Sequence, residues 1–484
     1  MRRTKIVCTI GPATSSPEGL RRLAEAGMDV ARLNFSHGTH EQHAEVVANI
    51  RALAEDIGRP ITIMQDLSGP KVRVGQIEGN GVTLVPGDEF ILASEPMVGN
   101  QHMASVSIPE IVESVPAGAH LLLDDGLIDL LVVRRKGDTL VTKVVIGGVL
   151  SSHKGVNAPG HSLPIASITD KDLEDLKFGI EQKVDWIAAS FIRNSADMAV
   201  LRGVCNAARA RIPLIAKIEK HEAVKNIDDI LSVVDGVMVA RGDLGVEIPI
   251  DHVPIVQKMI IKKANAAGKP VITATQMLDS MIRNPRPTRA EVSDVANAIY
   301  DGTDAIMLSG ETAVGQYPFY AVSMMDQIAC CTEGSLSYRH IAPEPKDKLS
   351  PQEVGDQEAM TRSIAQATCD VAQDLGATAI IAATSSGTTA LAISRYRPSV
   401  PIIAPTTSRR TYSRLGLVWG VAPVMTGEVA TSDEMMQACI EATLRIGAAK
   451  DGDIVVVTGG VPVNIPGSTN FLKVHRIGQP LFSA

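Results

Sequence analysis

The chain has 484 residues, a formal net charge of −8, 45% hydrophobic residues and an aromatic content of only 3%. A length of this size exceeds what one hydrophobic core usually organises, so about three globular domains are expected. The negative net charge and the scarcity of aromatic side chains argue against nucleic-acid binding, which relies on cationic surfaces and on stacking of aromatic side chains against bases.

The sequence shows no signature of export or of a membrane span. Residues 1–7 (MRRTKIV) lead into a strand without an apolar signal core, and long uninterrupted apolar runs are missing. The six cysteines show neither CxxC spacing nor a neighbouring histidine cluster, which argues against disulfides and zinc. We expect a cytoplasmic protein with reduced thiols and no membrane partner.

Eight short runs rich in Val and Ile are the main structural signal. Each except the third is followed after a few residues by an amphipathic, helix-like stretch, a pattern that predicts a (β/α)8 barrel. The runs are 5–10, 29–33, 61–65, 185–189, 213–218, 236–240, 270–274 and 304–308.

The third run is followed by a different region. Closely spaced strands at 81–85, 89–92 and 120–123, separated by Gly- and Pro-containing turns, predict an inserted all-β lid of barrel-like form. Its position after a barrel strand suggests that it closes an active site.

After a polar linker at 342–351, strands at 378–383, 401–404 and 453–458 predict a second α/β unit. The expected fold class is therefore an α/β chain: a (β/α)8 TIM barrel with an inserted lid and a C-terminal α/β domain. The proposed domain limits are 1–70 and 165–341 for the catalytic barrel, 71–164 for the lid and 342–484 for the regulatory domain.

Polar and charged side chains gather at the carboxyl ends of the predicted barrel strands, where catalytic groups of such barrels lie. Those residues are Arg32, Asn34, Asp66, Lys217, Glu219, Asp243, Thr275, Ser309 and Glu311.

Glu219 and Asp243 follow neighbouring strands and supply two hard oxygen ligands, which suit Mg²⁺ or Mn²⁺. The alternative is that both are loop acids paired with Lys or Arg, which the strand-end positions disfavour. Lys217 lies two residues before Glu219, so both side chains project to one face of their strand. The Lys217 ammonium and a metal bound by Glu219 would then both contact the group that is transferred.

Arg32, Arg73 and Lys154 are candidates for clamping phosphate oxygens, although each alone could be a solvated surface cation. Thr275 and Ser309 could orient a water that carries a proton, or could satisfy backbone groups at a strand end. Of the two we favour Thr275. Neither a P-loop nor a protein-kinase glycine loop is present in the sequence, so a nucleotide must be held in another way.

Several long motifs in order resemble the pyruvate kinase family over the whole chain. They are residues 4–13 (TKIVCTIGPA), 31–38 (ARLNFSHG), 217–219 (KIE), 240–247 (ARGDLGVE), 275–278 (TQML) and 286–298 (RPTRAEVSDVANA).

The resemblance implies that phosphoenolpyruvate, ADP, ATP and pyruvate are the reactants, and that the chain forms a homotetramer. It assigns the divalent metal to Glu219 and Asp243, and stabilisation of the transferring phosphoryl group to Lys217. The implied contacts to phosphoenolpyruvate are Arg32, Lys217, Gly242, Asp243 and Thr275, with Lys217, Thr275 and Arg32 as the catalytic set. The implied nucleotide contacts are Arg73, Lys154 and Asn34.

One segment departs from many family members, in which a monovalent cation is bound. Asn34, Ser36 and Asp66 are retained, but Leu67 replaces a Thr and Lys71 replaces a Glu, as in the K⁺-independent branch. The Lys71 ammonium could supply the missing charge. We therefore expect K⁺ to be dispensable.

The predicted C-terminal domain carries a hydroxyl-rich turn between a strand and a helix. It comprises Thr384, Ser385, Ser386, Gly387, Thr388 and Thr389. Such a turn can bind a phosphorylated allosteric effector, or can simply cap the helix. The loop at 459–469 is a candidate cover for that ligand.

Two other functions compete with this interpretation. A metal-dependent aldolase or lyase would need the same Glu and Asp pair, but the lid and the phosphate-clamping cations argue against it. A non-catalytic sensor of phosphorylated metabolites predicts a damaged ring of barrel residues, and the ring is intact.

Overall fold

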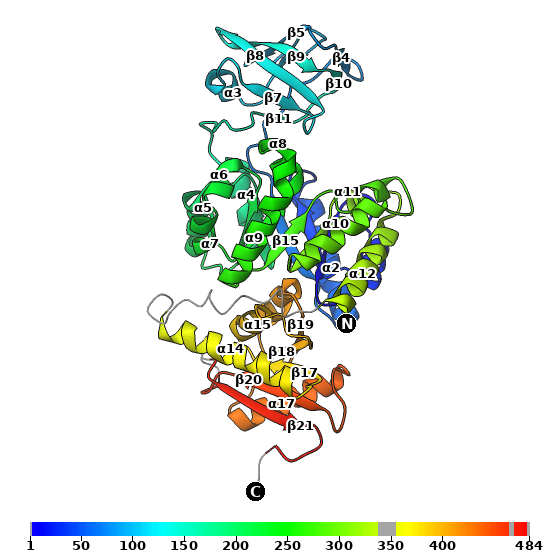
Figure 1. Ribbon diagram of the computed structural model, residues 1–484, viewed down its shortest axis with the longest axis vertical. Coiled ribbons are helices and arrows are strands. Elements are labelled where there is room, and N and C mark those ends of the chain that lie inside the picture. Colours follow the sequence, from blue (N-terminus) through cyan, green and yellow to red (C-terminus); the bar gives the residue numbers. More distant parts are fainter. Residues whose placement is uncertain (1, 337–354, 464–468, 482–484) are drawn as a thin grey trace.

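The computed structural model describes residues 2–336, 355–463 and 469–481. The chain forms three tiers along its long axis, with a β-rich unit at one end, a barrel in the middle and an α/β unit at the other end (Figure 1). The predicted linker at 342–351 and part of the predicted covering loop at 459–469 lie outside the described residues.

The central tier is a closed barrel of eight parallel strands. The expected (β/α)8 barrel is therefore confirmed, with every predicted strand within one or two residues of its observed position. Every residue of the eight strands is buried except Asn34, because helices cover the outer side of the barrel and packed side chains fill its interior. The strands are β1 (Lys5–Ile10), β2 (Val30–Asn34), β3 (Thr62–Leu67), β12 (Trp186–Ala189), β13 (Leu214–Ile218), β14 (Gly236–Ala240), β15 (Val271–Ala274) and β16 (Ala305–Leu308).

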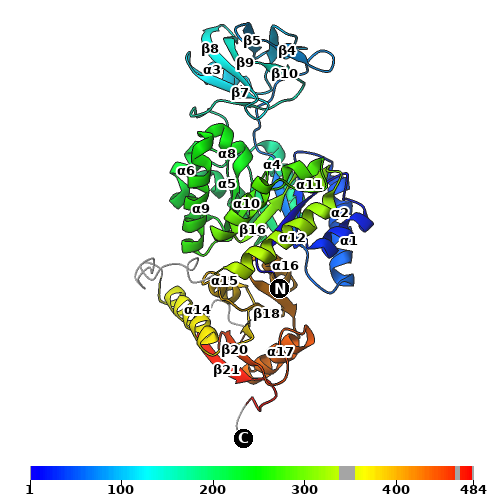
Figure 2. The ribbon, with the colours of Figure 1, turned by 45° about the vertical axis from the view of Figure 1, so that its right-hand side comes forward.

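Helices follow the barrel strands and surround them (Figure 2). Several begin at a reciprocal capping box, such as Thr39 with Gln42 and Thr288 with Glu291, which satisfies the free N–H groups of the first turn. The helices are α1 (Pro17–Ala26), α2 (His40–Asp56), α4 (Asp170–Glu181), α5 (Ser195–Ala207), α6 (His221–Lys225), α7 (Ile227–Val233), α8 (Arg241–Glu247), α9 (Val253–Ala267), α10 (Arg289–Tyr300), α11 (Gly310–Ala313) and α12 (Pro318–Ser335).

The inserted unit has its own hydrophobic core. Its strands pair as one six-stranded sheet and one two-stranded ladder. The entering segment bridges both edges of the six-stranded sheet, because Arg73 lies opposite Gly155 and Val74 lies opposite Val106, next to the two outermost strands. The elements are β4 (Val82–Leu84), β5 (Glu89–Ala93), β6 (Met103–Ser105), α3 (Glu110–Ser114), β7 (His120–Leu123), β8 (Ile128–Lys136), β9 (Thr139–Ile146), β10 (Gly148–Leu150) and β11 (Val156–Asn157).

The C-terminal tier is a five-stranded sheet with helices, as expected, but two of its strands were not predicted. β19 contains Pro423, which weakens a strand pattern and is tolerated because β19 lies at the edge of the sheet. The elements are α14 (Asp356–Asp374), β17 (Ala379–Ala382), α15 (Thr388–Ser394), β18 (Ile402–Thr406), α16 (Arg409–Arg414), β19 (Val421–Met425), α17 (Ser432–Arg445), β20 (Ile454–Gly459) and β21 (Phe471–Arg476).

The two outer tiers contact opposite ends of the barrel. The C-terminal tier reaches the amino ends of the strands, where Lys5 Nζ donates to Val421 O and Trp186 Nε1 donates to Arg414 O. The lid faces the carboxyl ends (Figure 1). None of the helices described combines the length and the apolarity needed to cross a membrane.

Candidate active site

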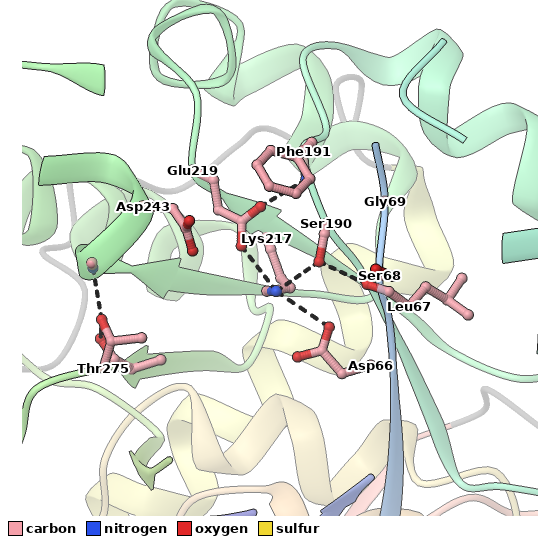
Figure 3. A network of polar contacts seen from close by, with 12 residues as sticks. Asp66, Leu67, Ser68, Gly69, Ser190, Phe191, Lys217, Glu219, Asp243 and Thr275 are labelled. Atoms are coloured by element: carbon pink, nitrogen blue, oxygen red, sulfur yellow. Dashed lines mark hydrogen bonds and ion pairs between the residues drawn. The ribbon is translucent and has the colours of Figure 1, made fainter. Parts of the chain in front are cut away.

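The lid-facing end of the barrel holds a buried lysine at the centre of a polar network. The Lys217 ammonium lies 2.9 Å from Glu219 Oε1 and 3.3 Å from Asp66 Oδ1, and it donates to Ser190 Oγ at 2.7 Å (Figure 3). Ser190 Oγ in turn donates to Leu67 O. Three strands, β3, β12 and β13, therefore fix the position of one positive charge.

The charges of this network stabilise each other against the cost of burial. Burial alone would lower the pKa of Lys217, but the neighbouring Asp66 and Glu219 carboxylates outweigh it and hold that pKa above its ordinary value. Burial likewise opposes ionisation of Asp66, yet Lys217 and Arg32 hold its pKa below the usual range. Lys217 is thus a permanent cation at the end of the barrel.

Arg32 extends the positive charge across the barrel. Its Nε donates to Asp66 Oδ2 at 2.7 Å and its Nη1 donates to Thr9 Oγ1 at 2.9 Å. Asp66 therefore contacts both Arg32 and Lys217, one through each carboxylate oxygen.

The two carboxylates predicted to bind a metal are brought together. Burial raises the pKa of Glu219, and the nearby negative charge of Asp243 adds to this rise although Lys217 opposes it. Glu219 Oε2 accepts from Phe191 N at 2.7 Å, and the buried Oε1 lies 2.9 Å from the Lys217 ammonium. The Asp243 carboxylate lies 3.2 Å from the Lys71 ammonium.

This donor set fits a divalent cation. The Glu219 and Asp243 carboxylates lie close enough for the charge of Asp243 to raise the pKa of Glu219, and hard carboxylate oxygens are the ligands that Mg²⁺ and Mn²⁺ prefer. Within residues 2–336, 355–463 and 469–481, no cluster of three His, Cys, Asp or Glu side chains could hold a metal by itself. Substrate oxygens and water would have to complete the coordination.

Thr275 joins the substrate side of the site to helix α8. Its hydroxyl donates to Ala274 O at 2.6 Å and accepts from Gly242 N at 2.7 Å. Thr275 and Gln276 both have positive φ angles, at 70° and 53°, which is unusual for side chains of this kind. Gly242, Asp243 and Thr275 therefore form one connected edge of the site.

Ser309 and Glu311 follow β16, as the sequence predicted. Ser309 Oγ is buried without a hydrogen-bond partner among the described residues. The buried Glu311 carboxylate accepts from Ser309 N at 2.7 Å and from Leu278 N at 3.1 Å. Glu311 thus connects the loops that follow β15 and β16.

The residues related to the monovalent-cation site already have partners within the protein. Asn34 Oδ1 accepts from Ser36 N, Ser36 Oγ donates to Ser68 Oγ, and Leu67 O accepts from Ser190. The Lys71 ammonium contacts Asp243, and no described contact joins it to Asn34, Ser36 or Asp66.

Arg73 and Lys154 lie in the lid, apart from the Lys217 network. Arg73 Nη1 donates to His153 O at 3.0 Å, and Lys154 Nζ pairs with Asp124 at 2.8 Å. The lid contacts the barrel through Asn157 Nδ2, which donates to Glu247 Oε1 on helix α8. The helix that carries Asp243 is therefore also a contact point of the lid.

The hydroxyl-rich turn of the C-terminal tier borders a pocket of about 620 Å³, counted to its open mouth. Thr384, Ser385, Ser386 and Thr389 line it. Thr384 Oγ1 accepts from Gly387 N, and Ser386 Oγ shares a hydrogen bond with Thr388 Oγ1. Helix α15 begins after Gly387 without a side-chain cap, so these hydrogen bonds order the turn and do not cap the helix, while the pocket leaves room for a ligand.

Ser190 and its neighbour Phe191 were missed by the sequence reasoning. Both follow β12 directly, at the same carboxyl edge that identified the other site residues. The strand-end rule would have found Ser190, but a single hydroxyl after a strand also fits an ordinary turn.

A (β/α)8 barrel with buried cations and paired carboxylates at the carboxyl ends of its strands defines a barrel enzyme that acts on an anionic substrate. Comparison with known proteins identifies the family. The family model "Pyruvate kinase, barrel domain" matches residues 1–322, and "Pyruvate kinase, alpha/beta domain" matches residues 362–475.

Individual relatives agree over the whole chain. A pyruvate kinase of Geobacillus stearothermophilus is 50% identical over 99% of this chain and 81% of its own length. Pyruvate kinase 2 of a Synechocystis species is 46% identical over 98% of this chain and 79% of its own length. A pyruvate kinase of Clostridium acetobutylicum is 44% identical over 99% of this chain and 100% of its own length. The chain belongs to the pyruvate kinase family and is a phosphotransferase of glycolysis.

Proposed function

We propose that the chain transfers the phosphoryl group of phosphoenolpyruvate to ADP, giving pyruvate and ATP. The observation that carries this proposal is the Lys217 ammonium, fixed between Asp66, Glu219 and Ser190. Transfer of a phosphoryl group is catalysed mainly by positioning and by neutralising the charge on its oxygens. A rigid, always charged lysine beside a metal-ligand pair provides both.

The residues of the site have separate roles in this proposal. Lys217 and Arg32 hold the phosphoryl oxygens, and Gly242, Asp243 and Thr275 complete the phosphoenolpyruvate site. A divalent cation bound by Glu219 and Asp243, Mg²⁺ or Mn²⁺, supplies Lewis-acid stabilisation when present. Thr275 places the proton for the enolate through a water, because its own hydroxyl proton is held by Ala274 O.

The nucleotide is proposed to lie between the barrel and the lid. Arg73 and Lys154 supply cations from the lid for its phosphates, and Asn34 contributes from the end of β2. The Lys154 pair with Asp124 is partly exposed and can open at small cost. The proposed domain limits, with a lid at 71–164, follow this division. A homotetramer and a cytoplasmic location stay predictions.

We also propose that turnover does not require K⁺. Asn34, Ser36 and the Leu67 carbonyl make hydrogen bonds within the protein, and Asp66 is held by two cations. Lys71 brings a further ammonium to Asp243.

Pyruvate formation from phosphoenolpyruvate, ADP and Mg²⁺, coupled to lactate dehydrogenase, tests the reaction. We expect turnover in K⁺-free Tris buffer that stops when EDTA removes the metal. Turnover that appears only after K⁺ is added would refute the K⁺ proposal alone. Absence of turnover with K⁺, Mn²⁺ and candidate effectors would refute the reaction.

The pocket beside residues 384–389 is proposed to bind a phosphorylated effector. Its hydroxyl groups and the nearby backbone N–H groups are suited to phosphate oxygens. Calorimetry with fructose 1,6-bisphosphate, glucose 6-phosphate and AMP tests this. Heat that disappears in the variant Thr384→Ala/Ser386→Ala supports the site, and silence from all three ligands leaves these hydroxyl groups only the role of ordering the turn.

A further inference from the structure

A second cleft lies between the barrel and the C-terminal tier, at the opposite end of the barrel from the active site. It measures about 1670 Å³, counted to its open mouth. Helix α2 and residues 180–185 form the barrel side, and helix α16 forms the other side. The residues of the proposed effector turn do not line it.

The cleft carries more positive than negative charge. Five cationic side chains and two carboxylates line it, namely Arg51, Lys183, Arg409, Arg410 and Arg414 with Glu55 and Asp185. Both carboxylates form ion pairs with other residues of the cleft, because Asp185 lies 2.9 Å from Arg51 and Glu55 lies 3.0 Å from Arg409.

Three cations of the cleft therefore lack a carboxylate partner among the described residues: Lys183, Arg410 and Arg414. Burial, followed by the repulsion of Arg410, lowers the pKa of Arg414 to about 10. The Arg414 Nε is buried without a hydrogen-bond partner in the described part of the chain. Arg410 lies close enough to Arg414 to repel it, such a pair of like charges attracts an anion, and guanidinium groups match phosphate oxygens in geometry.

Most of the remaining lining is apolar. Pro60, Ile180 and Ile212 contribute hydrocarbon surface, and the Tyr412 ring crosses the cleft, with its hydroxyl donating to Gly58 O. Apolar walls with a few convergent charged groups are typical of sites for small organic ligands. If only an inorganic anion were bound, the apolar walls of the cleft would stay exposed to water.

We propose that this cleft binds an organic phosphate monoester, with the phosphate at Lys183, Arg410 and Arg414 and the organic body against the apolar wall. This goes beyond the proposed reaction and does not depend on it.

The cleft is also connected to the strands that carry the active site. Thr62 Oγ1 donates to Ser413 O, Trp186 Nε1 donates to Arg414 O, and Ile63 N donates to Asp185. These contacts lie at the starts of β3 and β12, whose far ends carry Asp66 and Ser190. A ligand that tightens the cleft therefore acts on the two strands that position Lys217.

Titration calorimetry of the full chain in EDTA tests the proposal, with AMP, ribose 5-phosphate and inorganic phosphate as probes. Comparing AMP with ribose 5-phosphate shows whether the cleft prefers a nucleotide or a sugar phosphate. The decisive variant is Lys183→Ala/Arg410→Ala, because both side chains are exposed and their loss leaves the fold intact. Its matched control is Lys177→Ala/Arg134→Ala, which removes one exposed lysine and one exposed arginine outside the cleft.

We expect at least one ester to bind more tightly than inorganic phosphate. Its affinity falls at least tenfold in Lys183→Ala/Arg410→Ala, while the control pair and Thr384→Ala/Ser386→Ala keep a site of wild-type affinity. Absence of ester binding overturns the proposal, and so does an equal loss in the control pair. Binding that is lost only in Thr384→Ala/Ser386→Ala assigns the ligand to the other pocket, and inorganic phosphate binding as tightly as the esters refutes the organic ligand.

Discussion

At the scale of single residues, Asp66 holds the site together. It is buried, and its two oxygens face Arg32 at 2.7 Å and Lys217 at 3.3 Å. Glu219 offers a second negative charge to Lys217 but none to Arg32. Asp66 is therefore the group whose removal leaves two buried cations without adequate compensation.

The substitution Asp66→Asn keeps the size of the side chain and removes its charge. We expect a loss of about 3 kcal/mol in the free energy of unfolding, because an uncompensated buried charge is costly. The matched control is Asp56→Asn, whose exposed pair with Arg21 is expected to contribute less than about 1 kcal/mol. Urea unfolding monitored by circular dichroism compares them, and equal midpoints would contradict this role of Asp66.

At the scale of elements, the turn after β3 connects the barrel to the lid and limits the space around Phe191. Gly69 has φ at +64°, and a Cβ atom there would lie 2.7 Å from Phe191 Cδ2. The Phe191 N–H donates to Glu219. A side chain at position 69 would therefore displace a donor that orients a proposed metal ligand.

Gly58 provides a matched control for Gly69, since its φ is +66° and a Cβ atom would meet nothing within 4 Å. Gly58→Ala is expected to cost about 1 kcal/mol of stability through its backbone angle alone, with kcat unchanged. Gly69→Ala adds the displacement of Phe191, so we expect kcat to fall by roughly tenfold or more. Equal kcat values for the two variants would show that the contact with Phe191 does not matter.

Much of the fold could be predicted because apolar runs and turn residues are local signals. All eight barrel strands were found in this way, and so were Asp66, Lys217 and Glu219, which follow from the strand-end rule. The edge strands β19 and β21 were missed, since Pro423 weakens the pattern of the first, and the second is mostly unburied and lacks the apolar run that marks the other strands. The contact of Lys71 with Asp243 depends on how the lid meets the barrel, which no local pattern encodes.

At the scale of the whole molecule, the C-terminal tier is held to the barrel by a buried ion pair. Arg397 Nη1 lies 2.8 Å from Asp304 Oδ1, and Nη2 donates to Asn265 Oδ1 and Gly302 O. The other oxygen of Asp304 accepts from Val271 N at the start of β15. One arginine thus connects the C-terminal tier to two barrel strands.

The substitution Arg397→Leu leaves Asp304 buried without its cation. We expect a loss of about 3 kcal/mol and a lower melting temperature in scanning calorimetry. Arg409→Leu is the control, because its pair with Glu55 also joins the two tiers but is exposed, and it should cost less than about 1 kcal/mol. If both variants melt at the wild-type temperature, the ion pair does not hold the tiers together.

The central claim is that the Lys217 ammonium neutralises the phosphoryl group during transfer. The most direct test is steady-state pyruvate formation by Lys217→Met, compared with the wild type and with Lys177→Met, which removes an exposed lysine of α4. We predict that kcat of Lys217→Met falls by about 10³-fold or more, the scale seen when a preorganised charge-stabilising group is lost. Lys177→Met should match the wild type. A kcat for Lys217→Met within tenfold of the wild type would contradict the account.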